Sequence, residues 1–122
     1  MTRALGRFGE AWAVGVLHRL GYQVIDRNVR FRSGELDIVA REGGDVVFVE
    51  VKCRRSSAYG SPEESISVRR FTRLATAANE YIGRHDLQGC SVRLDLMAIE
   101  VGADGRVARH NLIRGIESPQ RG

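Results

Sequence analysis

The chain has 122 residues, 43% of them apolar and 28% charged, which suits one globular domain and excludes both a disordered segment and a two-domain enzyme. No apolar run approaches the roughly 18 residues that a membrane-spanning helix needs, so we expect no membrane partner. The N-terminus lacks the apolar core of a signal peptide and the two cysteines form no CxxC motif, so we expect a reducing, cytoplasmic setting. The net charge of +4 permits a polyanionic partner without requiring one.

Hydrophobic periodicity and turn residues predict an α/β fold with a single mixed β-sheet flanked by helices, in the order α-β-β-β-α-β-β. We expect this single domain to span 1–116, followed by a loose C-terminal tail over 117–122. In chain order the expected elements are a helix over 3–20, a strand over 22–26 with an extension to 32, strands over 35–41 and 46–53, an exposed loop over 54–64, a helix over 65–84, and strands over 92–101 and 106–113.

The Gly-Gly pair at 43–44 separates two β-rich runs, a pattern typical of a tight hairpin, because such turns need positive φ angles. If these are the two loop residues, the numbers of opposite residues sum to 87. Asp37 then faces Glu50, and Glu35 faces Lys52. Because side chains alternate along a strand, these four share one face. The other face carries only apolar residues, namely Leu36, Ile38, Ala40, Val47, Val49 and Val51.

Two acids placed opposite each other on neighbouring strands repel unless something compensates their charge. A divalent cation would do so, and carboxylate oxygens are the ligands that Mg²⁺ and Mn²⁺ prefer. Lys52 is the sole lysine among nineteen basic residues, and its compact amine differs from guanidinium in having a tunable pKa. Asp37, Glu50 and Lys52 together favour metal-assisted hydrolysis of a phosphodiester, in which the lysine orients the attacking water or steadies the developing charge. The alternative is a solvated face with weak cross-strand ion pairs, but the apolar strand around Glu50 and Lys52 makes unpaired charge costly there.

The segments around these residues resemble the YraN-like family of small bacterial proteins. The matching pieces are GELDIVA at 34–40 and VFVEVKCR at 47–54, with GEA at 9–11, NVR at 28–30 and YGSP at 59–62. The family is similar to the PD-(D/E)xK nuclease superfamily, close to archaeal Holliday-junction resolvases, and so implies a restriction-endonuclease-like fold.

The resemblance also implies roles by position. Asp37 and Glu50 match the two metal-binding acids, with the Val51 carbonyl completing the metal site, and Lys52 matches the catalytic lysine. Glu10 matches an acid that resolvase-like relatives contribute from a helix, although the sequence alone favours compensation of a helix dipole. Glu35 matches the glutamate of the same motif, and we expect it to pair with Lys52 or to bind metal through water.

Arginines flank this hairpin in the sequence, where the phosphates of a nucleic acid would pass. Those expected to contact phosphate are Arg30, Arg32, Arg54, Arg55 and Arg70, the last standing where relatives often carry a lysine. For any one of them, a solubilising surface role explains the residue as well.

The sequence therefore predicts a nuclease that uses Mg²⁺ or Mn²⁺ to hydrolyse the phosphodiester bonds of DNA, with branched or damaged DNA as candidate substrates and a homodimer as one candidate assembly. The alternative is a non-catalytic module that binds nucleic acid or protein on the same fold. Asp95, in a later RLD segment, can be structural and is left out of the site.

Overall fold

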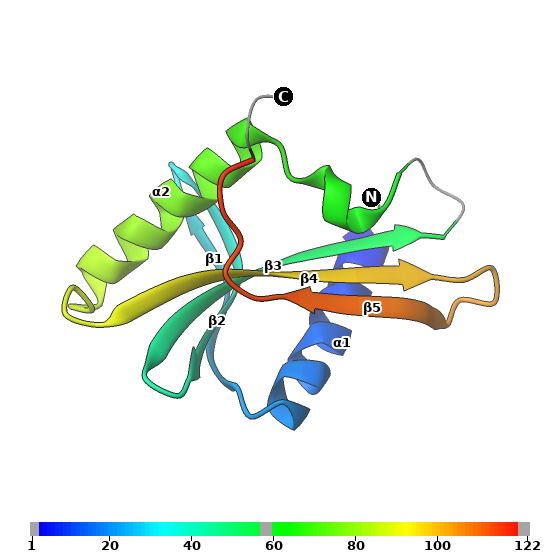
Figure 1. The fold of residues 1–122 in the computed structure, drawn as a ribbon, viewed down its shortest axis with the longest axis horizontal. Helices are drawn as coiled ribbons and strands as arrows, with labels where there is room; N and C mark the ends of the chain where they lie inside the picture. Colours follow the sequence, from blue (N-terminus) through cyan, green and yellow to red (C-terminus); the bar gives the residue numbers. More distant parts are fainter. Residues whose placement is uncertain (1–2, 57–59, 120–122) are drawn as a thin grey trace.

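The computed structural model describes residues 3–56 and 60–119, and it has the predicted order of helices and strands (Figure 1). The elements are α1 (Arg3–Arg19), β1 (Gln23–Phe31), β2 (Gly34–Glu42), β3 (Asp45–Arg55), the short 3-10 helix η1 (Pro62–Ser65), α2 (Val68–Arg84), β4 (Ser91–Val101) and β5 (Val107–Ile113). Within those described residues, neither α-helix is long and apolar enough to cross a membrane.

The second helix begins later than the sequence predicted, at Val68 instead of 65. Ser67 is in an extended conformation and its side chain accepts a hydrogen bond from the backbone N–H of Arg70, so it caps the helix. Pro62 starts η1 in the segment that was expected to be loop. The YGSP segment is only partly described, because Tyr59 lies outside the described residues.

The five strands form one sheet in the order β1-β2-β3-β4-β5. Strands β3 and β4 are parallel and connected through α2, and all other neighbours are antiparallel. The hairpin register is the predicted one, from Glu42 opposite Asp45 to Ile38 opposite Val49. Pairing ends there, so the expected opposite pairs at 37/50 and 35/52 lie beyond the paired part of the hairpin.

Each face of the sheet is covered by one helix. Ala13 and Leu17 of α1 pack against one face with Val49, whereas Leu74 of α2 packs against the other with Phe48. Both faces of the central hairpin therefore carry buried apolar side chains, and the expected division into one apolar and one polar face is wrong.

The strand β2 also departs from simple alternation. Leu36 packs in the core beneath α2, while Ile38 packs in the core beneath α1, although residues two apart in a regular strand share a face. The prediction that these two residues share one face is wrong, because β2 twists away from β3 at the position between them, Asp37.

Two glycines let the helices approach the strands closely. A Cβ at Gly9 of α1 would lie 2.7 Å from the Cβ of Cys53, so only glycine allows this contact with β3. A Cβ at Gly34 of β2 would lie 3.0 Å from the carbonyl oxygen of Arg73 in α2. These contacts fix the positions of the residues that follow each glycine, Glu10 and Glu35.

Candidate metal and nucleic-acid site

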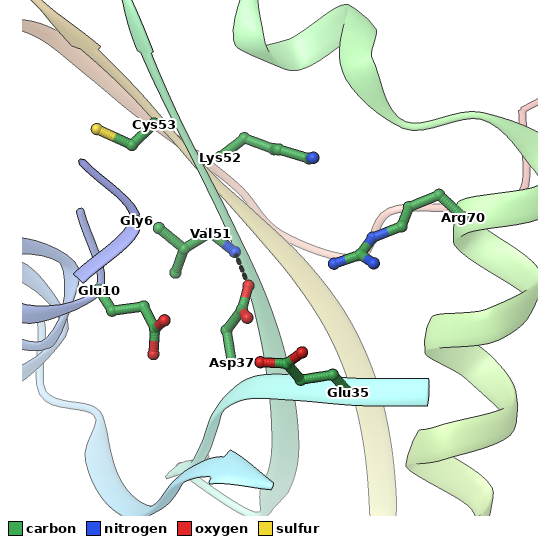
Figure 2. Close-up of a pocket in the computed structure, with 8 residues that line it drawn as sticks. All are labelled: Gly6, Glu10, Glu35, Asp37, Val51, Lys52, Cys53 and Arg70. Carbon is green, nitrogen blue, oxygen red and sulfur yellow. Dashed lines mark hydrogen bonds between the residues drawn. The ribbon is translucent and has the colours of Figure 1, made fainter. Parts of the chain in front are cut away.

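The candidate site is a pocket of about 180 Å³ at the point where β2 separates from β3. Beyond Val49, β3 stays paired with β4 as far as Arg55, but β2 no longer covers its other edge. The N-terminal halves of α1 and α2 close the two sides of this opening (Figure 2). The lining residues are Gly6, Glu10, Glu35, Asp37, Val51, Lys52, Cys53 and Arg70.

Asp37 takes over a hydrogen bond that a regular hairpin would make through the backbone. Its Oδ2 accepts a hydrogen bond from the backbone N–H of Val51 at 2.9 Å, as Figure 2 shows. Continuing the register would have placed Leu36 opposite Val51. Because the N–H and C=O of one strand residue point the same way, the Val51 carbonyl also faces this opening. The structure therefore brings the carboxylate and the carbonyl of the predicted metal site together.

Glu50, the residue before Val51 on β3, is 0% exposed and does not itself line the pocket. Its Oε2 accepts a hydrogen bond from Nε of Arg70 at 2.6 Å, across from α2. Its other oxygen, Oε1, is the one buried side-chain polar atom in the described part of the chain that has no hydrogen-bond partner. Such an atom is costly in a folded protein, so it marks a place where a proton or a cation belongs.

The second buried acid, Asp95, differs from Glu50 because it has no carboxylate oxygen without a hydrogen-bond partner. Asp95 is also 0% exposed, but both of its oxygens have partners. Oδ1 accepts from Arg93 at 2.8 Å and from the N–H of Gly115 at 3.0 Å, and Oδ2 accepts from the hydroxyl of Tyr22 at 2.9 Å. Asp95 is thus a satisfied structural acid, in agreement with its omission from the predicted site.

The pKa values of Asp37 and Glu50 are shifted in opposite directions. Burial raises the pKa of Asp37 to about 9, helped by its hydrogen bond with Glu50 and by the charge of Glu50. Burial alone would also raise the pKa of Glu50, but the hydrogen bonds from Asp37 and Arg70 outweigh burial and lower it. A proton on this pair of acids is therefore held more tightly by Asp37 than by Glu50.

Glu10 and Glu35 bring further negative charge to the same pocket. Glu10 reaches it from α1, and burial raises its pKa, with smaller contributions of the same sign from the charges of Glu35 and Glu50. Glu35 forms a loose ion pair with Arg30, at 3.9 Å. The expected pairing of Glu35 with Lys52 is not found among the described residues.

Lys52 lies on the opposite side of the pocket from Glu10, together with Arg70 (Figure 2). Its charge acts on Glu50 and helps to lower the pKa of that carboxyl group. Across residues 3–56 and 60–119, no hydrogen bond or ion pair engages the Lys52 ammonium. The pocket thus has acids on one wall and two cations on the other.

Of the arginines expected to contact phosphate, only Arg70 lines the pocket. The side chain of Arg30 is 80% exposed beside Glu35, and Arg32 is exposed just after β1. Arg54 and Arg55 lie at the end of β3, which continues from the site. Sequence reasoning missed the pairing of Arg70 with Glu50, since nothing in the spacing along α2 distinguishes it from the neighbouring arginines.

A divalent cation fits this donor set in part. No group of three or more His, Cys, Asp or Glu side chains among the described residues is arranged to hold a metal. The protein therefore offers two carboxylates, Asp37 and Glu50, and the Val51 carbonyl. Mg²⁺ commonly binds through one or two carboxylates and takes its remaining ligands from water and substrate phosphates, so this incomplete set suits it.

Comparison with known proteins gives the family. The family model described as "Uncharacterised protein family UPF0102" matches residues 9–99, which include Glu10 and both strands of the hairpin, β2 and β3. The chain belongs to UPF0102. A UPF0102 protein from Symbiobacterium thermophilum is 45% identical over 107 residues, which cover 88% of this chain and 91% of the relative. UPF0102 proteins from Moorella thermoacetica and Caldicellulosiruptor saccharolyticus are 41% and 38% identical, and each alignment covers more than nine-tenths of both chains.

Proposed function

We propose that this UPF0102 protein is a metal-dependent nuclease that hydrolyses phosphodiester bonds of DNA. The observation that carries the proposal is the fully buried Oε1 of Glu50, which has no hydrogen-bond partner in the described part of the chain. The other oxygen of this carboxylate is bound to Arg70, which lines the pocket together with Asp37 and Lys52. A merely structural acid would have its oxygens satisfied, as Asp95 does. A pocket with acids on one wall and cations on the other suits a metal ion together with a phosphate group.

Asp37, Glu50 and the Val51 carbonyl would hold Mg²⁺ or Mn²⁺. When bound, such an ion lowers the pKa of water and polarises a phosphate oxygen. Lys52 has no competing partner in the described part of the chain, so its ammonium can orient the attacking water or balance the charge that develops on the phosphate. The terminal nitrogens of Arg70 can donate to phosphate while its Nε keeps Glu50 ionised. Glu10 adds a carboxylate from α1 that can act through water.

The test is cleavage of labelled duplex, single-stranded, flap and four-way-junction DNA by purified protein with Mg²⁺ or Mn²⁺. Asp37→Asn and Lys52→Ala should abolish cleavage, whereas Asp104→Asn, which alters an exposed acid in the turn before β5, should leave it unchanged. Equal cleavage by all four proteins would indicate a contaminant and contradict the assignment of the site. Binding of DNA without cleavage in either metal would favour the non-catalytic module instead.

A further inference from the structure

The strand β1 has an unusual backbone at one residue beside the site. Asn28 has a φ of 53°, in the left-handed region, although it lies in the middle of a strand. Asp86, in the turn after α2, is the other non-glycine residue with positive φ in the described part of the chain. Asparagine and aspartate tolerate this conformation better than other side chains, but within a strand it interrupts regular pairing.

The register places this interruption opposite the site. Arg27 pairs with Ile38 and Val29 pairs with Leu36, so Asn28 lies across from Asp37, and that pair is missing from the ladder. A further irregularity lies between Val24 and Asp26, a few residues earlier on β1. Of these two irregularities, the one at Asn28 lies beside the part of β2 that is no longer paired with β3.

The side chain of Asn28 faces Glu10 across the gap between β1 and α1. Both Glu10 oxygens are acceptors, so the amide nitrogen is the atom that must face them. Nδ2 then lies 2.7 Å from Oε1 and 3.2 Å from Oε2 of Glu10. No other hydrogen bond to the Glu10 carboxylate is found among residues 3–56 and 60–119.

We propose that Asn28 is a positioning residue, which holds the Glu10 carboxylate toward the pocket so that it contributes to divalent-cation binding. This rests on the proposed function, because it assigns Glu10 to the same metal site. The left-handed backbone turns the Asn28 side chain out of the regular strand pattern, and the amide then donates to an acid that the negative charges of Glu35 and Glu50 repel. Without that donor, the long Glu10 side chain is free to rotate into solvent.

The test compares Mn²⁺ binding by wild type, Glu10→Gln, Asn28→Gly and the double variant, using electron paramagnetic resonance of free Mn²⁺. Glycine accepts the left-handed backbone and removes only the amide, so the fold is retained, which thermal unfolding checks. We expect Asn28→Gly to weaken Mn²⁺ binding about 10-fold, in the range usual for outer-shell partners of metal ligands. The double variant should bind no more weakly than Glu10→Gln, because the amide acts only through that carboxylate.

Asp86→Gly is the matched control, since it places glycine at the other left-handed position and should leave Mn²⁺ binding unchanged. Asn28→Asp is a second variant that keeps the backbone preference but repels Glu10, and it should weaken binding as well. Wild-type affinity in Asn28→Gly, or additive losses in the double variant, would overturn the positioning role while leaving the nuclease proposal intact. Absence of Mn²⁺ binding and of cleavage in the wild type would overturn both.

Discussion

Truncating Arg70 leaves the fully buried carboxylate of Glu50 without the guanidinium that lies 2.6 Å away. Breaking a buried ion pair by removing one partner typically costs about 3–5 kcal/mol, because the remaining charge has no compensation. Two features reduce that figure here. The Arg70 side chain is itself 36% exposed, and the charge of Lys52 also acts on the Glu50 carboxyl group and helps to lower its pKa. We therefore expect Arg70→Ala to lower the free energy of unfolding by about 2 kcal/mol in metal-free buffer.

A loss of this size reduces the ratio of folded to unfolded protein by about 30-fold. For a domain of this length it lowers the melting temperature by about 8 °C. The assay is thermal unfolding followed by circular dichroism, first with EDTA and then with Mg²⁺ or Mn²⁺. A bound cation takes the place of the missing guanidinium beside Glu50, so added metal should stabilise Arg70→Ala more than it stabilises the wild type.

Arg69→Ala is the control, because Arg69 is the exposed neighbour on the same turn of α2. It should unfold within about 2 °C of the wild type, since surface substitutions rarely change stability by more than ~0.5 kcal/mol. The reasoning is refuted if Arg70→Ala and Arg69→Ala unfold together in EDTA. It is also refuted if metal stabilises Arg70→Ala no more than the wild type, because the cation would then not occupy the position beside Glu50.

Three further outcomes follow from the same geometry. The raised pKa of Asp37, about 9 against an ordinary 3.8, means that its contribution to stability is full below about pH 4 and declines as pH rises toward 9. In metal-free buffer at pH 8, Asp37→Asn should therefore have a larger free energy of unfolding than the wild type. The wild type should also release about one proton on binding Mg²⁺ at pH 7, which calorimetry in buffers of different ionisation enthalpy measures. Lys52→Arg should lower the cleavage rate by about 100-fold or more and leave Mn²⁺ affinity near the wild-type value, since the amine acts on the reacting groups and is not a ligand; equal losses in both would contradict that role. Gly9→Ala should destabilise the protein by about 1–3 kcal/mol in urea unfolding, because the added Cβ meets Cys53. Gly15→Ala in the same helix should stabilise it by about 0.5–1 kcal/mol, since a Cβ there lies 3.7 Å from the nearest atom, a nitrogen of the Arg19 side chain.

The hairpin could be predicted from the sequence because its determinants are local. The Gly-Gly pair at 43–44 allows the tight turn, and the turn then fixes the register as far as Ile38 and Val49. Burial of Glu50 could be predicted from the apolar residues on either side of it. These features depend on side chains only a few positions away in the chain, which sequence patterns report well.

The pairing partners within the site could not be predicted in the same way. The resemblance singled out Arg70 as a contact for phosphate, but its pairing with Glu50 depends on how α2 docks on the sheet. The role of Asn28 is hidden for the same reason, because its left-handed backbone and its contact with Glu10 arise from the meeting of β1 with α1. Such contacts join residues that are distant in the chain, and no short motif encodes them.

The acids of the pocket need an opening in a sheet whose two faces are both covered by helices. A regular five-stranded sheet would bury Asp37 and Glu50 in a continuous ladder, without access for an ion or a phosphate. The separation of β2 from β3 provides access, and it coincides with the irregular part of β1 opposite Asp37. The separation has a cost, since an N–H of β3 loses a backbone partner, and the Asp37 carboxylate supplies the missing acceptor. The same carboxylate therefore stabilises the opened sheet and belongs to the proposed metal site, which explains how a chain this small can combine a pocket lined by Asp37 with a buried core on each face of the sheet.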